Sequence, residues 1–325
     1  MRRDMMLAPA FCSMILLTAS GWAAARPLER MAVSGSDYVR LADWGESVHC
    51  GMRWNKKDGQ IELSGPSARL NFAVDSRRAE VSGVAVWLSL PVASRNGAPL
   101  ISLADLRSTI EPLLSPRKSE GRVQTVCLDP GHGGKDTGKA VGRSYEKKYT
   151  LLLAEETAAL LREQGFKVVM TRTKDEAVEL SDRPLLAERR GADLFVSLHY
   201  NAAEDGTRGV EVFCLAPAGM GSSDQGGGRS SQPAEAGNAQ DERNVLLAYQ
   251  LQKSITQSLP LEDLGLKRSR FEVLRLARMP AALIEGGFLS NAQEARSIYD
   301  GAFRKRMARA IVNGIVAYKR AVCQP

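Results

Sequence analysis

The 325-residue sequence is poor in aromatic residues, histidines and long apolar segments. Phe, Trp and Tyr make up 6% of the chain, so we expect a mainly aliphatic core. Beyond the first residues, no segment approaches the roughly 20 apolar residues that a membrane-spanning helix needs. Hydrophobic residues at 44% and charged residues at 25% are ordinary for a globular protein, which excludes a collagen-like, wholly disordered or multi-span membrane chain.

The sequence also lacks blocks of like charge. Its 44 basic and 37 acidic residues give a formal net charge of +7, spread along the chain. A mild positive excess favours weak attraction to anionic polymers such as a cell wall or a nucleic acid. Because there is no clustered basic patch and no known nucleic-acid-binding motif, no nucleic-acid partner is expected.

The N-terminus has the pattern of a secretory signal peptide. Arg2 and Arg3 precede an apolar stretch over residues 7–22, and three alanines end at Ala25. This pattern predicts a signal peptide over residues 1–25 that is cleaved after Ala25. The alternative is an uncleaved anchor, which polar residues inside the stretch disfavour. We therefore expect an exported protein of the periplasm or cell envelope, without stable membrane insertion after cleavage.

Cysteine is scarce in the mature sequence, with four residues, Cys50, Cys127, Cys214 and Cys323. Export permits disulfides, and the three ways of pairing four thiols remain open. None of them has a CxxC or Cys/His metal spacing, so we expect buried or structurally paired cysteines.

The length suits about two domains. The first is expected over residues 36–114 as a small α+β domain. Ser36 is positioned to begin a helix, short alternating strands follow between residues 61 and 90, and Ser102 is positioned to begin a second helix. Residues 115–122 form a polar, basic linker.

Residues 123–322 are expected to form an α/β domain with a mostly parallel sheet and helices on both faces. The pattern alternates strands with helices, and active groups in such sheets lie at the carboxyl ends of strands. Predicted strands cover residues 123–128, 166–170, 192–198, 209–215 and 279–285; predicted helices cover residues 147–164, 181–190 and 302–320. Residues 216–242 are rich in Gly, Ser, Gln and Ala, which predicts a flexible insertion.

Four ionisable residues stand at ends of these elements. His132 follows the first strand in a glycine-rich turn, His199 ends a later strand, Glu146 begins a helix and Glu285 ends an apolar strand. Two imidazoles and a carboxylate suit one Zn²⁺ ion and leave a fourth position for water. A second carboxylate outside the metal could then take and return a proton.

Each of these four residues could also have a purely structural role. Spacings of 14, 53 and 86 residues match no local zinc pattern. A histidine after a strand is often a buried group with its hydrogen bonds satisfied, and His49 is taken as structural. Glu146 could simply interact with the helix dipole. For Glu285 a structural role and a functional role are equally favoured, since burying a carboxylate is costly without a function.

Four motifs follow one another along the second half of the sequence. The first is Leu128-Asp-Pro-Gly-His-Gly-Gly-Lys-Asp136, and the other three are residues 145–148, 197–202 and 283–291. In this order they resemble the motifs of the zinc-dependent N-acetylmuramoyl-L-alanine amidases of the amidase-3 type. The resemblance covers about residues 122–320.

This resemblance implies a fold, an activity and a site. His132, Glu146 and His199 would hold one zinc ion and Glu285 would be the catalytic carboxylate. The implied reaction is hydrolysis of the amide between N-acetylmuramic acid and L-alanine in peptidoglycan, in cell-wall remodelling or daughter-cell separation.

Two further residues are candidates near the site. Asp129 could accept a hydrogen bond from one of the imidazoles. Asn201 is a candidate substrate contact, with a structural amide as the equal alternative.

Resemblance to known families also bears on the first domain and on the insertion at residues 216–242. Residues 79–86 and 90–97 resemble the N-terminal-type domain of copper amine oxidases, which implies a packing or wall-docking module. Some amidases carry an inserted helix that plugs the cleft until a protein activator displaces it. Residues 216–242 lie where such control would sit, and Glu235, Asp241 or Glu242 could reach the metal, but the composition favours a flexible lid.

Two other functions remain as alternatives to the peptidoglycan amidase. One is a non-catalytic envelope protein that only binds glycan. The other is a different zinc amidohydrolase that acts on free muropeptides.

Overall fold

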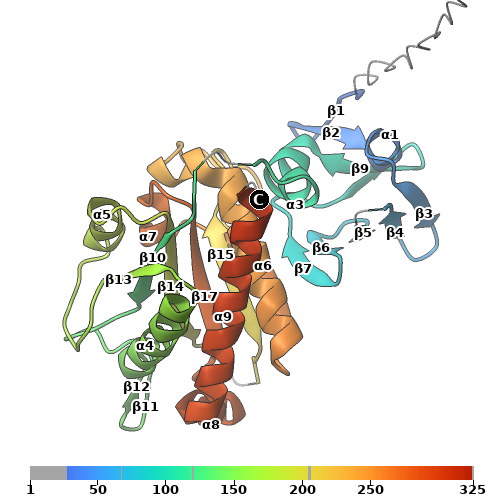
Figure 1. Ribbon diagram of the computed structural model, residues 1–325. Helices are drawn as coiled ribbons and strands as arrows, with labels where there is room; N and C mark the ends of the chain where they lie inside the picture. The colour runs from blue at the N-terminus through green and yellow to red at the C-terminus, as the bar shows by residue number, and fades with distance from the viewer. Residues whose placement is uncertain (1–27, 67, 119–120, 204–205, 324–325) are drawn as a thin grey trace, which may run out of the picture.

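The computed structural model describes residues 28–66, 68–118, 121–203 and 206–323 (Figure 1). The predicted signal peptide, residues 1–25, lies outside this range. Among the helices described, none combines the length and the apolar character needed to cross a membrane.

The main sheet of the molecule is mixed and has 11 strands, in the order β13-β10-β14-β17-β15-β16-β7-β6-β5-β4-β3. Six of these strands come from the second half of the sequence: β10 (Thr125–Pro130), β13 (Lys167–Met170), β14 (Leu194–Asn201), β15 (Val210–Leu215), β16 (Asp263–Ser269) and β17 (Ala281–Phe288). Strands β13, β10, β14 and β17 run parallel, whereas β15 runs antiparallel to β17.

The expectation of a mostly parallel sheet is therefore wrong. Strands β14 and β15 are joined by the short segment 202–209, and its described residues include no helix. A parallel connection normally needs a dozen or more residues, so β15 returns in the opposite direction. The five strands at the other end of the sheet follow one another along the chain and are also antiparallel.

Helices cover both faces of the sheet. On one face α4 (Glu146–Glu163), α6 (Asp241–Ser258) and α9 (Gly301–Val322) pack together over β10, β14 and β15. On the other face α5 (Asp182–Arg189) and α7 (Glu272–Arg275) cover a smaller core. The alternation of strand β10 explains the two cores, because Val126 and Leu128 enter the first and Cys127 enters the second. Helix α8 (Ala292–Tyr299) links β17 to α9.

Residues 28–66 and 68–114 contribute both to this sheet and to a separate four-stranded sheet, ordered β1-β2-β9-β8. The strands are β1 (Met31–Val33), β2 (Ser36–Arg40), β3 (Gly51–Asn55), β4 (Gln60–Ser64), β5 (Arg69–Ala73), β6 (Arg78–Val81), β7 (Val84–Trp87), β8 (Ala93–Arg95) and β9 (Ala98–Ser102). The helical turns are α1 (Leu41–Ser47), α2 (Leu103–Asp105), the π-helical turn η1 (Leu106–Ile110) and α3 (Glu111–Leu114).

The helix expected to begin at Ser36 begins instead at Leu41. Residues 36–40 form β2 because they pair with β9, and Tyr38 and Val39 are buried in this arrangement. The second expected start is correct, since the Ser102 hydroxyl accepts a hydrogen bond from the backbone of Asp105 at 3.0 Å.

The two sets of strands meet at β7 and β16, which pair in parallel through Val86 and Leu266. Asp263 Oδ2 accepts from the Ala85 backbone at 2.9 Å, and the Trp87 indole donates to the Leu264 carbonyl at 2.9 Å. The division into two domains at residues 115–122 stays a prediction. The regions before and after these residues contribute strands to one sheet.

Residues 216–242 also touch the first region. They contain the short 3-10 turns η2 (Ser223–Gln225) and η3 (Ala236–Gln240). The Gly228 backbone donates to the Ser89 carbonyl at 2.8 Å, and Arg77 donates to the Ser223 carbonyl at 3.1 Å. Whether this segment moves as a lid stays a prediction.

The four cysteines among the described residues are all unpaired. Cys127 and Cys214 are buried, and Cys50 and Cys323 are partly buried. Burial raises the pKa of the Cys214 thiol to about 11, which keeps it protonated and unreactive at neutral pH.

Candidate metal and catalytic site

A tight turn after strand β10 places His132. The residue adopts a left-handed backbone with φ of 63°, and it is followed by Gly133 and Gly134, which also have positive φ. The preceding Gly131 must lack a side chain, since a Cβ there would overlap the His199 imidazole. The glycine-rich sequence therefore lets the backbone of one strand end approach the histidine of the next.

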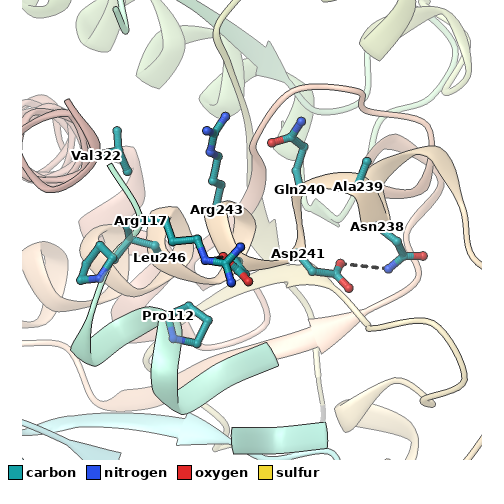
Figure 2. A pocket seen from close by; sticks show the side chains of 11 residues that line it. Pro112, Arg117, Asn238, Ala239, Gln240, Asp241, Arg243, Leu246 and Val322 are labelled. Carbon is teal, nitrogen blue, oxygen red and sulfur yellow. Dashed lines mark hydrogen bonds and ion pairs between the residues drawn. The ribbon is translucent and has the colours of Figure 1, made fainter. Parts of the chain in front are cut away.

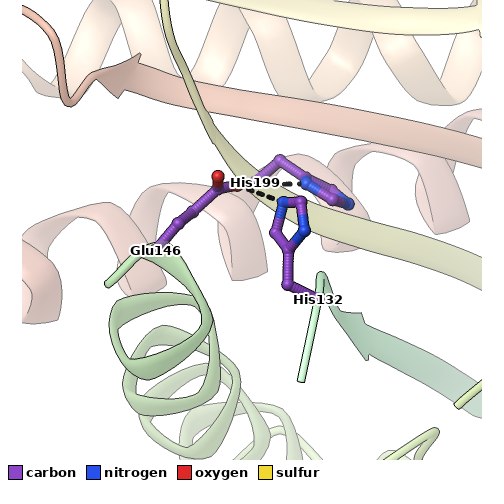
Figure 3. Close-up of side chains that lie close together, drawn as sticks. All are labelled: His132, Glu146 and His199. Carbon is purple, nitrogen blue, oxygen red and sulfur yellow. Dashed lines mark hydrogen bonds and ion pairs between the residues drawn. The ribbon is translucent and has the colours of Figure 1, made fainter. Parts of the chain in front are cut away.

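The structure brings His132, Glu146 and His199 together from three elements (Figure 3). Glu146 Oε1 lies 3.0 Å from His132 Nε2 and 3.1 Å from His199 Nδ1. One possible ligand atom from each residue lies within 4.8 Å of the others. This is the only such group of three found among the described residues, and it consists of the three predicted ligands.

The donor set and its surroundings fit a divalent cation. Two imidazole nitrogens and one carboxylate form a common zinc ligand set. At Gly138 a Cβ would lie 2.5 Å from Glu146 Oε2 and 2.6 Å from His132 Cδ2, so the backbone closes one side of the group.

Glu146 is held as a carboxylate. The backbone N–H groups of Tyr200 and Lys139 donate to its two oxygens at 3.0 and 2.9 Å. Burial alone raises the pKa of this carboxyl, but the hydrogen bonds and charges of the two histidines outweigh burial and hold the pKa well below its usual range. Burial lowers the pKa of His132, but its contacts with Glu146 and Asp136 outweigh burial. The pKa of His132 is therefore raised above its ordinary value.

Asp136, rather than the expected Asp129, supports the His132 imidazole. Asp136 Oδ2 lies 2.8 Å from His132 Nδ1. Asp129 instead forms a buried ion pair with Arg183 at 2.9 Å and accepts hydrogen bonds from Thr171 and Ser197. The reason is the alternation of β10, which directs Asp129 toward Ser197 of the neighbouring strand and away from the turn.

Glu285 lies one strand away from the three residues. It stands opposite His199 in the parallel pairing of β14 with β17. Burial, and then the charges of Glu146 and Glu211, raise the pKa of Glu285 well above its ordinary value. Its Oε2 atom is buried and has no hydrogen-bond partner within the described part of the chain. A carboxyl of raised pKa and free oxygen is suited to exchange a proton.

All four residues line one pocket of about 420 Å³. Its walls include apolar side chains from both sheet faces and loops, among them Leu180, which is 51% exposed at the rim. Asp129 and Asn201 also line it. A concave site with a few polar groups and apolar walls is typical of an enzyme pocket.

The acidic residues of the 216–242 segment lie elsewhere. Glu235 pairs with Arg270 and Arg275 at 3.4 and 3.1 Å. Asp241 and Glu242 line a different pocket of about 470 Å³, where Asp241 accepts from Asn238 (Figure 2). In this structure the site pocket is therefore lined by none of the three.

Sequence reasoning missed two residues that support the site, Glu211 and Lys267. Glu211 is 4% exposed and stands opposite Glu285 in the antiparallel pairing of β15 with β17. It forms an ion pair with Lys267 and accepts from Asn201 at 2.6 Å. The sequence did contain a signal for Glu211, because a glutamate within the apolar predicted strand 209–215 is unusual. The same signal pointed to Glu285 in its own apolar strand.

Comparisons with known proteins agree with this geometry. Residues 126–317 match the family of N-acetylmuramoyl-L-alanine amidases. The N-acetylmuramoyl-L-alanine amidase AmiA of Salmonella typhimurium is 35% identical over 226 residues, which cover 62% of this chain and 78% of AmiA.

Solved structures show the same similarity. The catalytic domain of the amidase CwlV from Bacillus (Paenibacillus) polymyxa var. colistinus aligns with a TM-score of 0.50 at 32% identity, over 60% of this chain and 97% of that domain. The amidase AmiC2 of Nostoc punctiforme aligns with a TM-score of 0.50 at 30% identity, over 62% and 99%. The family match covers more than half of the sequence and includes every residue of the site, so the chain belongs to the N-acetylmuramoyl-L-alanine amidase family.

Proposed function

We propose that this protein is a zinc-dependent hydrolase that cleaves the amide between N-acetylmuramic acid and L-alanine in peptidoglycan, in cell-wall remodelling. Membership of the amidase family supports the reaction. The observation that carries the proposal is the convergence of His132, Glu146 and His199 beside Glu285 in one pocket.

The three converging residues would hold one Zn²⁺ ion. When bound, zinc polarises a carbonyl and lowers the pKa of water toward about 7. The protein's part is to keep Glu146 ionised through two backbone donors and to fix the ring of His132 through Asp136.

Glu285 is the proposed proton carrier. Its carboxylate takes a proton from the attacking water and gives it to the amine nitrogen as the amide carbon–nitrogen bond breaks. The lack of a hydrogen-bond partner for the buried Oε2 atom among the described residues supports this role, because no protein donor competes for that oxygen. The apolar walls limit competing water around the reacting amide.

The experiment that tests the proposal is mass analysis of purified sacculi after digestion, with and without a chelator. We expect free stem peptides beginning with L-alanine, and their loss when zinc is removed. Peptides released only from soluble muropeptides would favour the other amidohydrolase, and no release with full zinc content would favour a glycan-binding protein.

A variant separates the proton carrier from the metal ligands. Glu285→Ala should keep one zinc per chain but lower turnover by about 10²–10⁴-fold, the range for loss of a general acid–base group. His132→Ala should instead lose both zinc and turnover. Zinc content by elemental analysis and peptide release are the two measurements, and unchanged turnover of Glu285→Ala would remove it from the reaction.

The cellular setting follows from the same reaction. Export to the periplasm or envelope, through the signal peptide predicted over residues 1–25, would bring the enzyme to its polymer. A wall-docking role for residues 36–114 and control by a protein activator remain parts of this proposal.

A further inference from the structure

A partly buried ion pair between Glu211 and Lys267 contacts the pocket wall through Asn201. Glu211 is 4% exposed and the Lys267 side chain 20%, and Glu211 Oε2 pairs with Lys267 Nζ. Neither residue is among those of the described chain that line the pocket, so neither is placed to touch a substrate. Any effect of the pair on the reaction must pass through other side chains.

The second oxygen of Glu211 binds Asn201. Asn201 Nδ2 donates to Glu211 Oε1 at 2.6 Å, and Asn201 Oδ1 accepts from the Ala202 backbone at 2.7 Å. Both polar ends of the amide are thus engaged within the protein. Asn201 lines the pocket as part of its wall and lies two residues after His199.

This hydrogen bond crosses the strand that carries Glu285. In the sheet β17 lies between β14, which holds Asn201, and β15, which holds Glu211. Glu285 stands opposite both His199 and Glu211. The backbone ladder is irregular at this point, because the register of β14 against β17 shifts between His199 and Asn201. Side chains must therefore supply the order that the ladder lacks.

The far side of the pair is closed by aromatic rings. Lys267 Nζ lies 5.9 Å from the centre of the Trp87 ring, on β7, and 6.0 Å from that of Phe213. Both distances allow cation–π attraction. The charge of Lys267 offsets that of Glu211, which would be costly to bury alone.

We propose that Glu211 and Lys267 form a positioning pair for the amidase reaction: through Asn201, Glu211 fixes the turn after His199 and the strand of Glu285, and Lys267 holds the Glu211 side chain in place. The inference rests on the proposed roles of His199 and Glu285. It assigns a function to a polar cluster outside the pocket, and it links the strand of Trp87 to the reaction.

Two double variants of the full chain isolate the hydrogen bond. Glu211→Gln/Lys267→Met removes both charges but keeps an amide oxygen for Asn201. Glu211→Met/Lys267→Met removes both charges and the oxygen, at similar side-chain size. We expect the second variant to show kcat about tenfold below the first on a soluble N-acetylmuramoyl peptide, with KM changed less than about threefold, because misplaced groups slow the chemical step.

A second readout does not need activity. Hydrogen exchange of residues 199–203 should be about tenfold faster in the Met/Met variant than in the Gln/Met variant, because the turn loses its anchor. Zinc content and melting temperature should agree between the two. The exposed pair Arg208 and Glu262, 3.6 Å apart, supplies the control, and Arg208→Met/Glu262→Gln should change neither kcat nor exchange.

Equal kcat and equal exchange in the two double variants would overturn the proposal. Faster exchange without a change in kcat would also overturn it, since the turn would then be irrelevant to the reaction. A parent protein without amidase activity would contradict the proposed function instead, and the exchange comparison would still decide whether Glu211 fixes the turn.

Discussion

At the scale of single residues, the three proposed zinc ligands are held in place by neighbouring groups. Glu146 is fixed by two backbone N–H groups and His132 by Asp136. The motif Asp-Pro-Gly-His-Gly-Gly-Lys-Asp contains both Asp129 and Asp136, and their roles differ completely. One stabilises the fold through Arg183, and the other orients the imidazole.

We predict that Asp136→Asn weakens zinc binding by about 10–100-fold, the usual effect of removing a carboxylate behind a metal-bound histidine. Titration with a competing chelator measures the affinity. The fold should be unaffected, because Asp136 is 63% exposed in its side chain. Unchanged affinity would mean that the hydrogen bond between Asp136 and His132 does not act on the metal.

At the scale of elements, most helices and strands of the second half agree with the sequence patterns. The predicted helix 147–164 is α4, Glu146–Glu163, and the predicted strand 279–285 lies within β17, Ala281–Phe288, apart from its first two residues. These elements were predictable because their apolar spacing is local. Strand β2 was missed because its partner β9 lies about 60 residues further along the chain, and only that pairing decides its conformation.

Helix α9 offers a test of a local signal for the start of a helix. Asp300 Oδ1 accepts a hydrogen bond from the Phe303 backbone at 2.7 Å, which caps the first turn. Asp300→Ala should lower the free energy of unfolding by about 1 kcal/mol, the typical value of an N-cap. Urea denaturation measures this loss, while zinc content stays constant. Asp300→Asn keeps an acceptor oxygen and should recover most of the stability.

At the scale of the whole molecule, the two regions are joined by a buried arginine. Arg268 is 0% exposed and donates to the Leu215 carbonyl at 3.0 Å and to Thr109 at 3.0 Å, besides a bond to the Ser108 carbonyl. The first acceptor belongs to β15, and the other two belong to the π-helical turn η1. A guanidinium with several fixed donors suits such a junction.

We predict that Arg268→Met lowers the free energy of unfolding by about 3 kcal/mol, because buried acceptors from both regions lose a charged donor. Urea denaturation followed by two probes, one in each region, measures the effect. The control is Arg278→Met, since Arg278 is 69% exposed and its loss should stay within about 0.5 kcal/mol. A similar small effect at Arg268 would show that the junction does not depend on it.

The sequence by itself was enough to predict the family, the four residues proposed for zinc binding and proton transfer, and the alternation of strands and helices. These depend on short motifs and on local periodicity, which need no knowledge of distant partners. Only the tertiary structure decided that β15 runs antiparallel, that Glu211 therefore stands beside Glu285, and that Asp136 rather than Asp129 supports His132. The physical reason is that strand direction and side-chain partners are set by pairing between residues far apart in the chain, which no local pattern encodes.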